Sequence, residues 1–383
     1  MSAIRQEAAA IDSGVDWLKT IDELGPRFAA RAADHDANDS FVAENYAELK
    51  ERGMFAAGIP AELGGGGASY AEVCEMLRRL ARYCSSTALA LSMHTHLVAG
   101  LVWRWRRDPR AVEGLLKRVA GERLVLISTA ASDWLNGSGQ AERVAGGWRV
   151  TARKIFGSGV PAGDLLITGA VYEDPEAGAT VLHFPLSLKA DGVRVLDTWR
   201  VMGMRATGSH DVAIEGAFVP ESAVSVRRPR GKWHVALHLG IVMALPIVYG
   251  VYLGIAEAAR DLAIRRARQR GRNNTDVCYL VGEMENELSA ARCAYADMVA
   301  IAATAEPEPE TTNSIVIDRT LVGRAVLAAV EKAIEVAGGT ALYRDVGLER
   351  LFRDVQAARY HPLQEKSQQR YTGRLALGLD IDG

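Results

Sequence analysis

The sequence has 383 residues, a formal net charge of −2 and 49% hydrophobic residues. A chain of this length and composition can bury a large core in two or three layers, which excludes a disordered protein. The near-neutral charge argues against nucleic acid as the main partner.

The cysteines and the N-terminus indicate the compartment. Four cysteines show no Cys-x-x-Cys pairing, and we interpret them as reduced core thiols: Cys74, Cys84, Cys278 and Cys293. The first twenty residues contain no apolar segment of the kind found in signal peptides. Both observations predict a cytoplasmic protein.

Residues 1–120 have the pattern of helices. A helix expected over residues 85–105 carries His94 and His96. Residues two apart in a helix do not share a face, so the pair is a poor metal site. We expect one of these histidines to line a substrate pocket instead.

Residues 121–225 have the pattern of strands. Six short apolar or alternating runs follow one another without helices between them, at 124–128, 143–150, 165–171, 180–184, 193–196 and 212–218. The Gly146-Gly147 step predicts a hairpin. This order predicts a small antiparallel barrel or sandwich.

Two loops of this middle part combine glycine with small hydroxyl residues. They are STAASDWLNGSG (128–139), which surrounds Trp134, and KIFGSG (154–159). Glycine and hydroxyl residues let a backbone approach a flat, polar-edged ligand and donate N–H bonds to it. Ordinary turns share this composition, so the pattern alone leaves both interpretations open.

Residues 226–383 return to a helical pattern. The stretch 239–256 is free of charge over eighteen residues, the lower limit for a membrane span. It contains proline and glycine, ends at Glu257, and has no second span after it. We therefore expect a helix buried in the protein or at a subunit interface, and no membrane partner.

Several common sites are unsupported. The sequence has no Gly-x-Gly-x-x-Gly after a strand, no Gly-x-Ser-x-Gly and no His-Glu-x-x-His. His234 and His238 have a spacing of four, but they flank an apolar helix and a tryptophan, which favours a pocket wall over a metal site. No metal site is predicted.

The segment DTWRVMGMRATGSHDVAIEGAFVP (197–220) resembles a motif of the acyl-CoA dehydrogenase superfamily, W-x-x-x-G-M-R-x-T-G-S followed by a strand and Val-Pro. Further matching segments run the length of the chain, at 58–67, 85–96, 147–159 and 338–354. The resemblance implies an α+β fold with a helical N-terminal domain (1–120), a middle antiparallel β-barrel (121–225) and a C-terminal four-helix bundle (226–383). It also implies a homotetramer with a flavin in the cleft between the domains.

The resemblance further implies a set of site residues. Ser128, Thr129, Phe156 and Ser158 would border the flavin ring, whether FAD or reduced FMN/FADH2. Arg270 and the Gly338-Gly339 turn would meet the pyrophosphate or adenosine of a neighbouring subunit's flavin, since an arginine suits pyrophosphate in charge and geometry. We expect a substrate pocket formed by His94, His96, Trp134, Trp233 and Tyr360.

One departure from the superfamily bears on the reaction. In the dehydrogenases a glutamate removes the acyl α-proton, and it sits either in a Glu-Gly-Thr step shortly after the C-terminal Arg-Asp or in the helix near the apolar stretch. The second position falls near Ala244 here, in a segment without acidic residues. At the first position, Arg353-Asp354 is followed by VQAARYHPL, so His361 and Pro362 stand in that place. A residue before proline leaves helical backbone angles, so the helix should end near Tyr360 with the imidazole at its exit. The nearest carboxylate, Glu365, is displaced by several residues.

A histidine at this place resembles the flavin-dependent monooxygenases of the same fold. Those enzymes take reduced flavin from a separate reductase and oxygenate their substrate through a flavin hydroperoxide. We therefore predict a monooxygenase that hydroxylates a small aromatic, sulfur-bearing or amine-bearing substrate, with His361 and Ser158 as catalytic residues. Two alternatives stay open: an acyl-CoA or acyl-carrier dehydrogenase that uses Glu365 or a base supplied by the substrate, and a catalytically inactive flavin-fold binding subunit.

Overall fold

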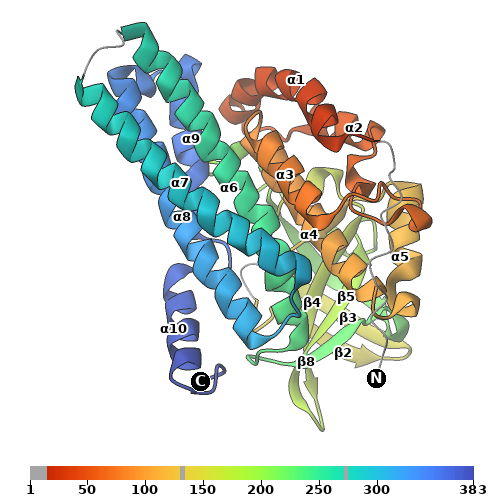
Figure 1. Cartoon of the computed structure of the whole chain (residues 1–383). Helices are drawn as coiled ribbons and strands as arrows, with labels where there is room; N and C mark the ends of the chain where they lie inside the picture. The colour runs from red at the N-terminus through yellow and green to blue at the C-terminus, as the bar shows by residue number, and fades with distance from the viewer. Residues whose placement is uncertain (1–14, 130–133, 271–274) are drawn as a thin grey trace.

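The structure of the chain is a computed structural model that describes residues 15–129, 134–270 and 275–383, without the side chain of Arg270. It has the predicted α+β composition: helices come first, strands follow, and long helices end the chain. In Figure 1 the strands lie beside the N-terminal helices, and the long C-terminal helices run alongside both.

The N-terminal part consists of five helices. They are α1 (Trp17–Ala37), α2 (Ala43–Glu51), α3 (Tyr70–Ala81), α4 (Ser85–Trp105) and α5 (Pro109–Glu122). A capping box begins α3: the Ser69 side chain accepts from the backbone of Glu72, whose carboxylate accepts from the backbone of Ser69. The α4 helix has few exposed residues because it packs between α3, α5 and the later helix α6.

The middle part is one eight-stranded sheet in the order β6-β7-β3-β2-β4-β5-β8, with β1 paired to β4. The strands are β1 (Leu126–Ser128), β2 (Gln140–Val144), β3 (Gly147–Gly157), β4 (Leu165–Asp174), β5 (Gly178–Ser187), β6 (Val193–Val195), β7 (His210–Pro220) and β8 (Val226–Pro229). The predicted hairpin joins β2 to β3, with Val144 opposite Gly147. We predicted an antiparallel arrangement, but the sheet is mixed, because β4 pairs in parallel with β1 and with β2.

The C-terminal part contains three long helices, α6 (Val235–Arg270), α7 (Thr275–Thr304) and α8 (Pro309–Ala337), which pack against one another. Two shorter helices complete it: α9 (Leu348–Val355) packs on α6 and α8, and α10 (Glu365–Ala376) packs on α8. In Figure 1 the three long helices run side by side, with α10 near the chain end.

The apolar stretch within α6 is a core helix. By length and composition α6 could cross a membrane, yet 89% of its apolar window is buried inside the chain. It packs against α3, α4 and α8, which cover it on several sides. Its lack of charge is therefore explained by burial within the protein's own core.

The cysteines differ in burial. Cys74 and Cys84 are buried, as predicted, and burial raises the pKa of both thiols. Cys278 and Cys293 lie exposed on α7. The interpretation of all four as core thiols is therefore wrong for the second pair.

The three parts of the chain meet at Asp354. Its carboxylate accepts the backbone N–H of Met204 at 2.5 Å and the hydroxyl of Ser85. The carboxylate is 1% exposed, and burial raises its pKa while these two hydrogen bonds oppose the rise. One side chain thus connects the sheet part, α4 and α9.

The neighbouring residue Arg353 makes a second connection. Its guanidinium binds Asp36 of α1 at 2.6 Å and the carbonyl oxygen of Met202 at 2.9 Å. The backbones also approach closely: a Cβ on Gly203 would lie 2.2 Å from the carbonyl oxygen of Arg353. Glycine is needed at residue 203 because no side chain fits there.

Candidate active site

A cleft of about 980 Å³ lies where the three parts of the chain meet. Residues of α4, of the loops between strands and of the segment that follows α9 line it. Seven residues predicted from the sequence are among them: Ser128, Trp134, Phe156, Ser158, Trp233, Tyr360 and His361. The folding of the chain therefore brings together residues that are up to 233 positions apart in the sequence.

Other predicted site residues lie away from this cleft. Thr129 is 2% exposed and donates its hydroxyl hydrogen to Thr168 at 3.0 Å. Gly338 and Gly339 form the end of α8, at the start of a 3₁₀ turn. The side chain of Arg270 lies outside the described residues. The expected contact of Arg270 and the two glycines with a neighbouring subunit's flavin stays a prediction.

The two histidines of α4 do not line the cleft. His94 uses both ring nitrogens in backbone contacts: Nε2 lies 2.8 Å from the carbonyl oxygen of Phe55, and Nδ1 accepts the N–H of Leu126 at 3.0 Å. Burial lowers its pKa to about 4, so it is neutral and joins α4 to the first strand. Burial and the nearby His94 also lower the pKa of His96 to about 4.

One wall of the cleft carries exposed aromatic surface and a row of hydroxyls. Phe156 is 46% exposed, although it is large and apolar, and its backbone has φ = 59°, which residues other than glycine rarely adopt. Its ring lies 6.0 Å from that of Trp199 at 87°. Beside it, the hydroxyl of Ser158 is 2.8 Å from that of Ser209. This wall offers a flat apolar surface with a polar edge.

His361 also lines the cleft. Its Nε2 is 2.5 Å from the hydroxyl oxygen of Tyr252, and its carbonyl oxygen accepts from Arg319 at 2.8 Å. Burial, the charge of Arg319 and the nearby His96 lower its pKa to about 3. The imidazole is therefore neutral at physiological pH.

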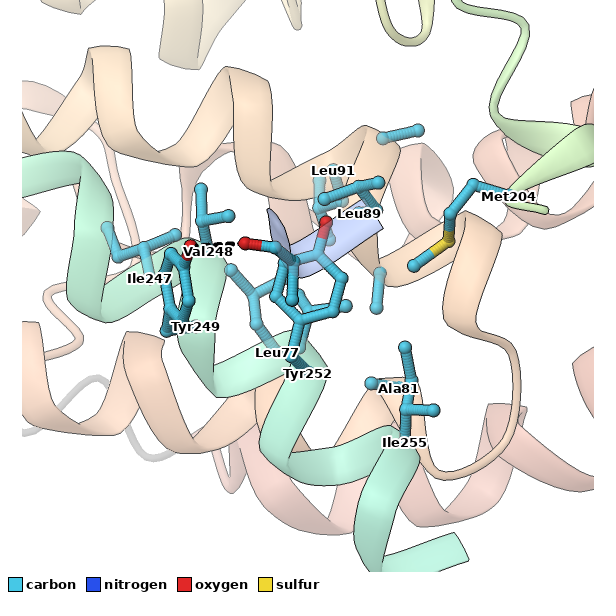
Figure 2. Packing of buried hydrophobic residues seen from close by; sticks show 14 of the residues in the cluster. Leu77, Ala81, Leu89, Leu91, Met204, Ile247, Val248, Tyr249, Tyr252 and Ile255 are labelled. Atoms are coloured by element: carbon cyan, nitrogen blue, oxygen red, sulfur yellow. Dashed lines mark hydrogen bonds between the residues drawn. The ribbon is translucent and has the colours of Figure 1, made fainter. Parts of the chain in front are cut away.

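The turn that carries His361 is held from α6 and α8. Tyr249 donates its hydroxyl hydrogen to the carbonyl oxygen of Ala358 at 2.7 Å, and Arg319 donates to the same oxygen at 3.1 Å. Figure 2 shows Tyr249 and Tyr252 next to each other on α6, within the apolar core. The sequence prediction missed these supports. A signal was present, because tyrosines three residues apart in an apolar helix share a face, and buried hydroxyls need partners.

The far end of the cleft is aromatic and basic. The ring of Trp233 lies 5.5 Å from that of Trp134 and 4.6 Å from that of Tyr371. The indole N–H of Trp134 is buried and has no acceptor among the described residues. Arg370 and Arg374 line this same end. These residues were not all predicted: Tyr371 and the two arginines lie in a helix whose sequence gives no sign that it borders a cleft.

Carboxylates are scarce in the cleft. Among the described residues that line it, Asp382 supplies the one side-chain carboxylate, and it accepts the backbone N–H of Trp233 at 2.7 Å. Glu365 does not line the cleft, but pairs with Arg324 at 2.5 Å. That arginine holds the pKa of Glu365 below its usual range. Glu365 is thus poorly placed to serve as the base of a dehydrogenase.

The cleft fits a flavin. Its volume lies at the upper end of the range for small-molecule and cofactor sites. Exposed Phe156 and Met202, at 46% and 60%, offer apolar surface for a planar ring to cover. Ser128 and Ser158 line the cleft and offer hydroxyls at its edge. The residues present therefore suit a flavin and a small substrate together.

The order of domains, with a cleft between them that suits a flavin, defines a class of flavin-dependent oxidoreductases. Residues 22–108 match the N-terminal domain of acyl-CoA dehydrogenase, and residues 247–365 match the C-terminal domain. The chain belongs to the acyl-CoA dehydrogenase family. It is 30% identical to the putative acyl-CoA dehydrogenase YdbM of Bacillus subtilis, over 92% of this chain and 94% of that protein.

Other relatives are oxygenating enzymes. The chain is 30% identical to L-evernosamine nitrososynthase of a Micromonospora species, over 93% of this chain and 89% of that enzyme. The structure of KijD3 in complex with FMN and a dTDP-linked amino sugar matches with a TM-score of 0.89 at 26% identity, covering 98% of this chain and 97% of that one. The predictions of a flavin-dependent oxidoreductase and of a flavin cofactor are confirmed, and these relatives support the monooxygenase over the dehydrogenase.

Proposed function

We propose that the protein uses reduced flavin and molecular oxygen to oxygenate a small amine-bearing substrate. The observation that carries this proposal is the chemistry of the wall at His361. A neutral imidazole stands where a dehydrogenase needs a carboxylate base, and Glu365 is held elsewhere by Arg324. Without a base within reach, abstraction of an α-proton from an acyl thioester is unsupported.

When bound in reduced form, the flavin would supply the activation of oxygen. The chain's own residues then have three tasks. Phe156 and Trp199 would border the ring and exclude water, while Ser158 would offer a hydroxyl at its edge. His361 lines the same cleft as a neutral polar group and would contact the reacting groups there.

We infer the substrate class from the far end of the cleft. Trp134, Trp233 and Tyr371 offer ring surface for a planar group, and Arg370 and Arg374 offer positive charge beside it. A nucleotide-linked amino sugar combines a planar base, an anionic diphosphate and an amine. The related L-evernosamine nitrososynthase and the dTDP-sugar complex of KijD3 support this class.

The reaction is tested by turnover of the purified protein with a flavin reductase, NADH and ¹⁸O₂. A dTDP-linked amino sugar serves as substrate. We expect a product that carries one or more ¹⁸O atoms and is absent without reduced flavin. The rival reaction is tested without oxygen: if an acyl-CoA bleaches the bound oxidised flavin and no substrate gains oxygen, the proposal is wrong and the dehydrogenase is correct.

The substrate class is tested separately by binding of dTDP, followed by quenching of tryptophan fluorescence. Trp134→Phe replaces the indole by a smaller ring and so removes aromatic surface from the cleft, and we expect dTDP to bind on the order of tenfold more weakly. Trp103→Phe is a matched control, because Trp103 lies outside the cleft. Equal affinity in all three proteins would contradict a role for Trp134 in recognition.

Three further features belong to this proposal. We infer that a separate reductase supplies the reduced flavin, that the protein acts as a homotetramer, and that it works in the cytoplasm. Two exposed apolar residues at the end of the 3₁₀ turn that follows α8, Leu342 and Tyr343, are 77% and 66% exposed and support a contact between subunits. Sedimentation of the purified protein tests the assembly, and a monomer would contradict it.

A further inference from the structure

His361 can face the cleft with either of two proton arrangements. A neutral imidazole carries one ring N–H, either on Nδ1 or on Nε2, and the other nitrogen is an acceptor. An N–H that faces the reacting groups stabilises developing negative charge, whereas a bare nitrogen accepts a proton as a base. The proton position therefore decides what the residue does.

The surroundings of Tyr252 restrict that choice. Tyr252 is 0% exposed, and burial holds the pKa of its hydroxyl well above the ordinary value, so the hydroxyl keeps its proton. Among the described residues, the one acceptor within hydrogen-bond distance of that hydroxyl is Nε2 of His361, at 2.5 Å. A hydroxyl that did not donate to Nε2 would leave a buried donor unpaired, which is unfavourable.

The opposite edge of the ring is the one left for the cleft. His361 lines the cleft and Tyr252 does not, so the nitrogen bound to Tyr252 points into the core. Within the part of the chain that the structure describes, Nδ1 has no hydrogen-bond partner. The neighbouring guanidinium of Arg319 disfavours a second proton on the ring.

We propose that Tyr252 donates its hydroxyl hydrogen to Nε2 of His361, which fixes the proton on Nδ1 and makes His361 a hydrogen-bond donor, not a base, towards the cleft. This inference rests on the proposed function for its meaning in the reaction, but the proton position itself is a property of the protein alone. Tyr252 acts through His361 and is a positioning residue.

Tyr249 provides a matched control for Tyr252. Both tyrosines lie on α6, both are 0% exposed, and both hydroxyls bond to the turn at 358–361. Tyr249 donates to the carbonyl oxygen of Ala358, and its ring centroid is 6.4 Å from that of His361. Replacement of either tyrosine by phenylalanine removes one buried hydroxyl, but only Tyr252→Phe removes the partner of the imidazole.

The first experiment measures the proton position by ¹⁵N NMR of protein labelled at histidine, with His361→Asn used to assign the signals. We expect a protonated Nδ1 and a bare Nε2 in the wild-type protein and in Tyr249→Phe. In Tyr252→Phe we expect a mixture of both forms and a higher pKa, because the donor that favours the neutral ring is gone. A proton on Nε2 in the wild type, or identical spectra in all three proteins, overturns the proposal.

The second experiment compares two replacements of His361 in the oxygenation assay. The amide of asparagine reaches about as far as Nδ1, and that of glutamine about as far as Nε2. If donation from Nδ1 matters, His361→Asn keeps on the order of tenfold more activity than His361→Gln, which corresponds to one hydrogen bond. Equal activities, or more activity with glutamine, overturn the donor role. A wild-type protein that oxygenates nothing contradicts the proposed function, while the NMR result still decides the proton position.

Discussion

Asp354 and His361 lie seven residues apart in one segment, and both are titratable groups held by hydrogen bonds, although Asp354 is buried and His361 is half-buried. Asp354 bonds to Met204 and Ser85 and thereby joins three parts of the chain. His361 bonds to Tyr252 on one edge and faces the cleft with the other. Burial favours the neutral form of both groups, so it raises the pKa of Asp354 and lowers the pKa of His361. Asp354 therefore maintains the architecture, whereas His361 is held by the architecture so that it faces the cleft.

The largest expected effect is on turnover by His361→Ala. Loss of a hydrogen-bond donor that stabilises charge developing on the reacting atoms typically lowers the rate by about 10²–10³-fold. The melting temperature should change little, because the turn at 358–361 is still held by Tyr249 and Arg319. Steady-state kinetics and calorimetry of the same preparation measure both. If His361→Ala lost its fold together with its activity, His361 would have an architectural role like that of Asp354.

Asp354→Ala should have the opposite profile. It leaves the N–H of Met204 and the hydroxyl of Ser85 buried without an acceptor, so the free energy of unfolding should fall by about 2–4 kcal/mol. Chemical denaturation measures the change. Asp36→Ala is a useful comparison, since it removes the more exposed ion pair with Arg353 and should cost less. An Asp354→Ala protein of unchanged stability would show that the contact is dispensable.

The two residues should also respond to acid with opposite sign. The pKa of His361 is lowered from 6.5 to about 3 in the folded protein, so only the unfolded chain takes up this proton as the pH falls below 6.5. Its contribution to stability is therefore unfavourable below that pH, by about 2 kcal/mol at pH 5. Because the folded-state pKa of Asp354 is raised, acidification relieves its penalty instead.

The variant His361→Asn isolates the contribution of His361 to the pH dependence of stability. The stability of the wild-type protein should fall more steeply between pH 7 and pH 5 than that of the variant, as measured by denaturation at each pH. His94 and His96, whose pKa values are also lowered, are present in both proteins and cancel in the difference. Parallel stability curves would mean that His361 is protonated in the folded protein.

The smallest expected effect is that of Glu365→Gln. The carboxylate pairs with Arg324 at an exposed site, so stability should change by less than about 1 kcal/mol and turnover should stay within about twofold. A dehydrogenase that used Glu365 as its base would lose most of its activity instead. This variant therefore tests the rival reaction directly.

The sequence predicted the fold more fully than the site. The motif at 197–220 and its companions predicted the family, and the mixed pairing of β4 was missed because short strands carry no sign of their partners. His361 and Phe156 were predicted from their places in motifs. Tyr252, Arg319 and Arg370 were missed because each acts across distances in sequence that only the packing of α6, α8 and α10 brings together. His94 was assigned to a pocket wall because the sequence shows the histidine but not its two backbone partners. The carbonyl group of Phe55 and the N–H of Leu126 approach the ring only in the folded chain.

The burial of α6 has a consequence for synthesis of the chain. This helix leaves the ribosome when α3 and α4 have already been made, so one part of its apolar surface finds its partners at once. The surface that packs on α8 stays uncovered until Pro309–Ala337 has followed. During that interval one face of an uncharged segment as long as a membrane span is open to water, and the nascent chain is then most exposed to aggregation and to binding by chaperones.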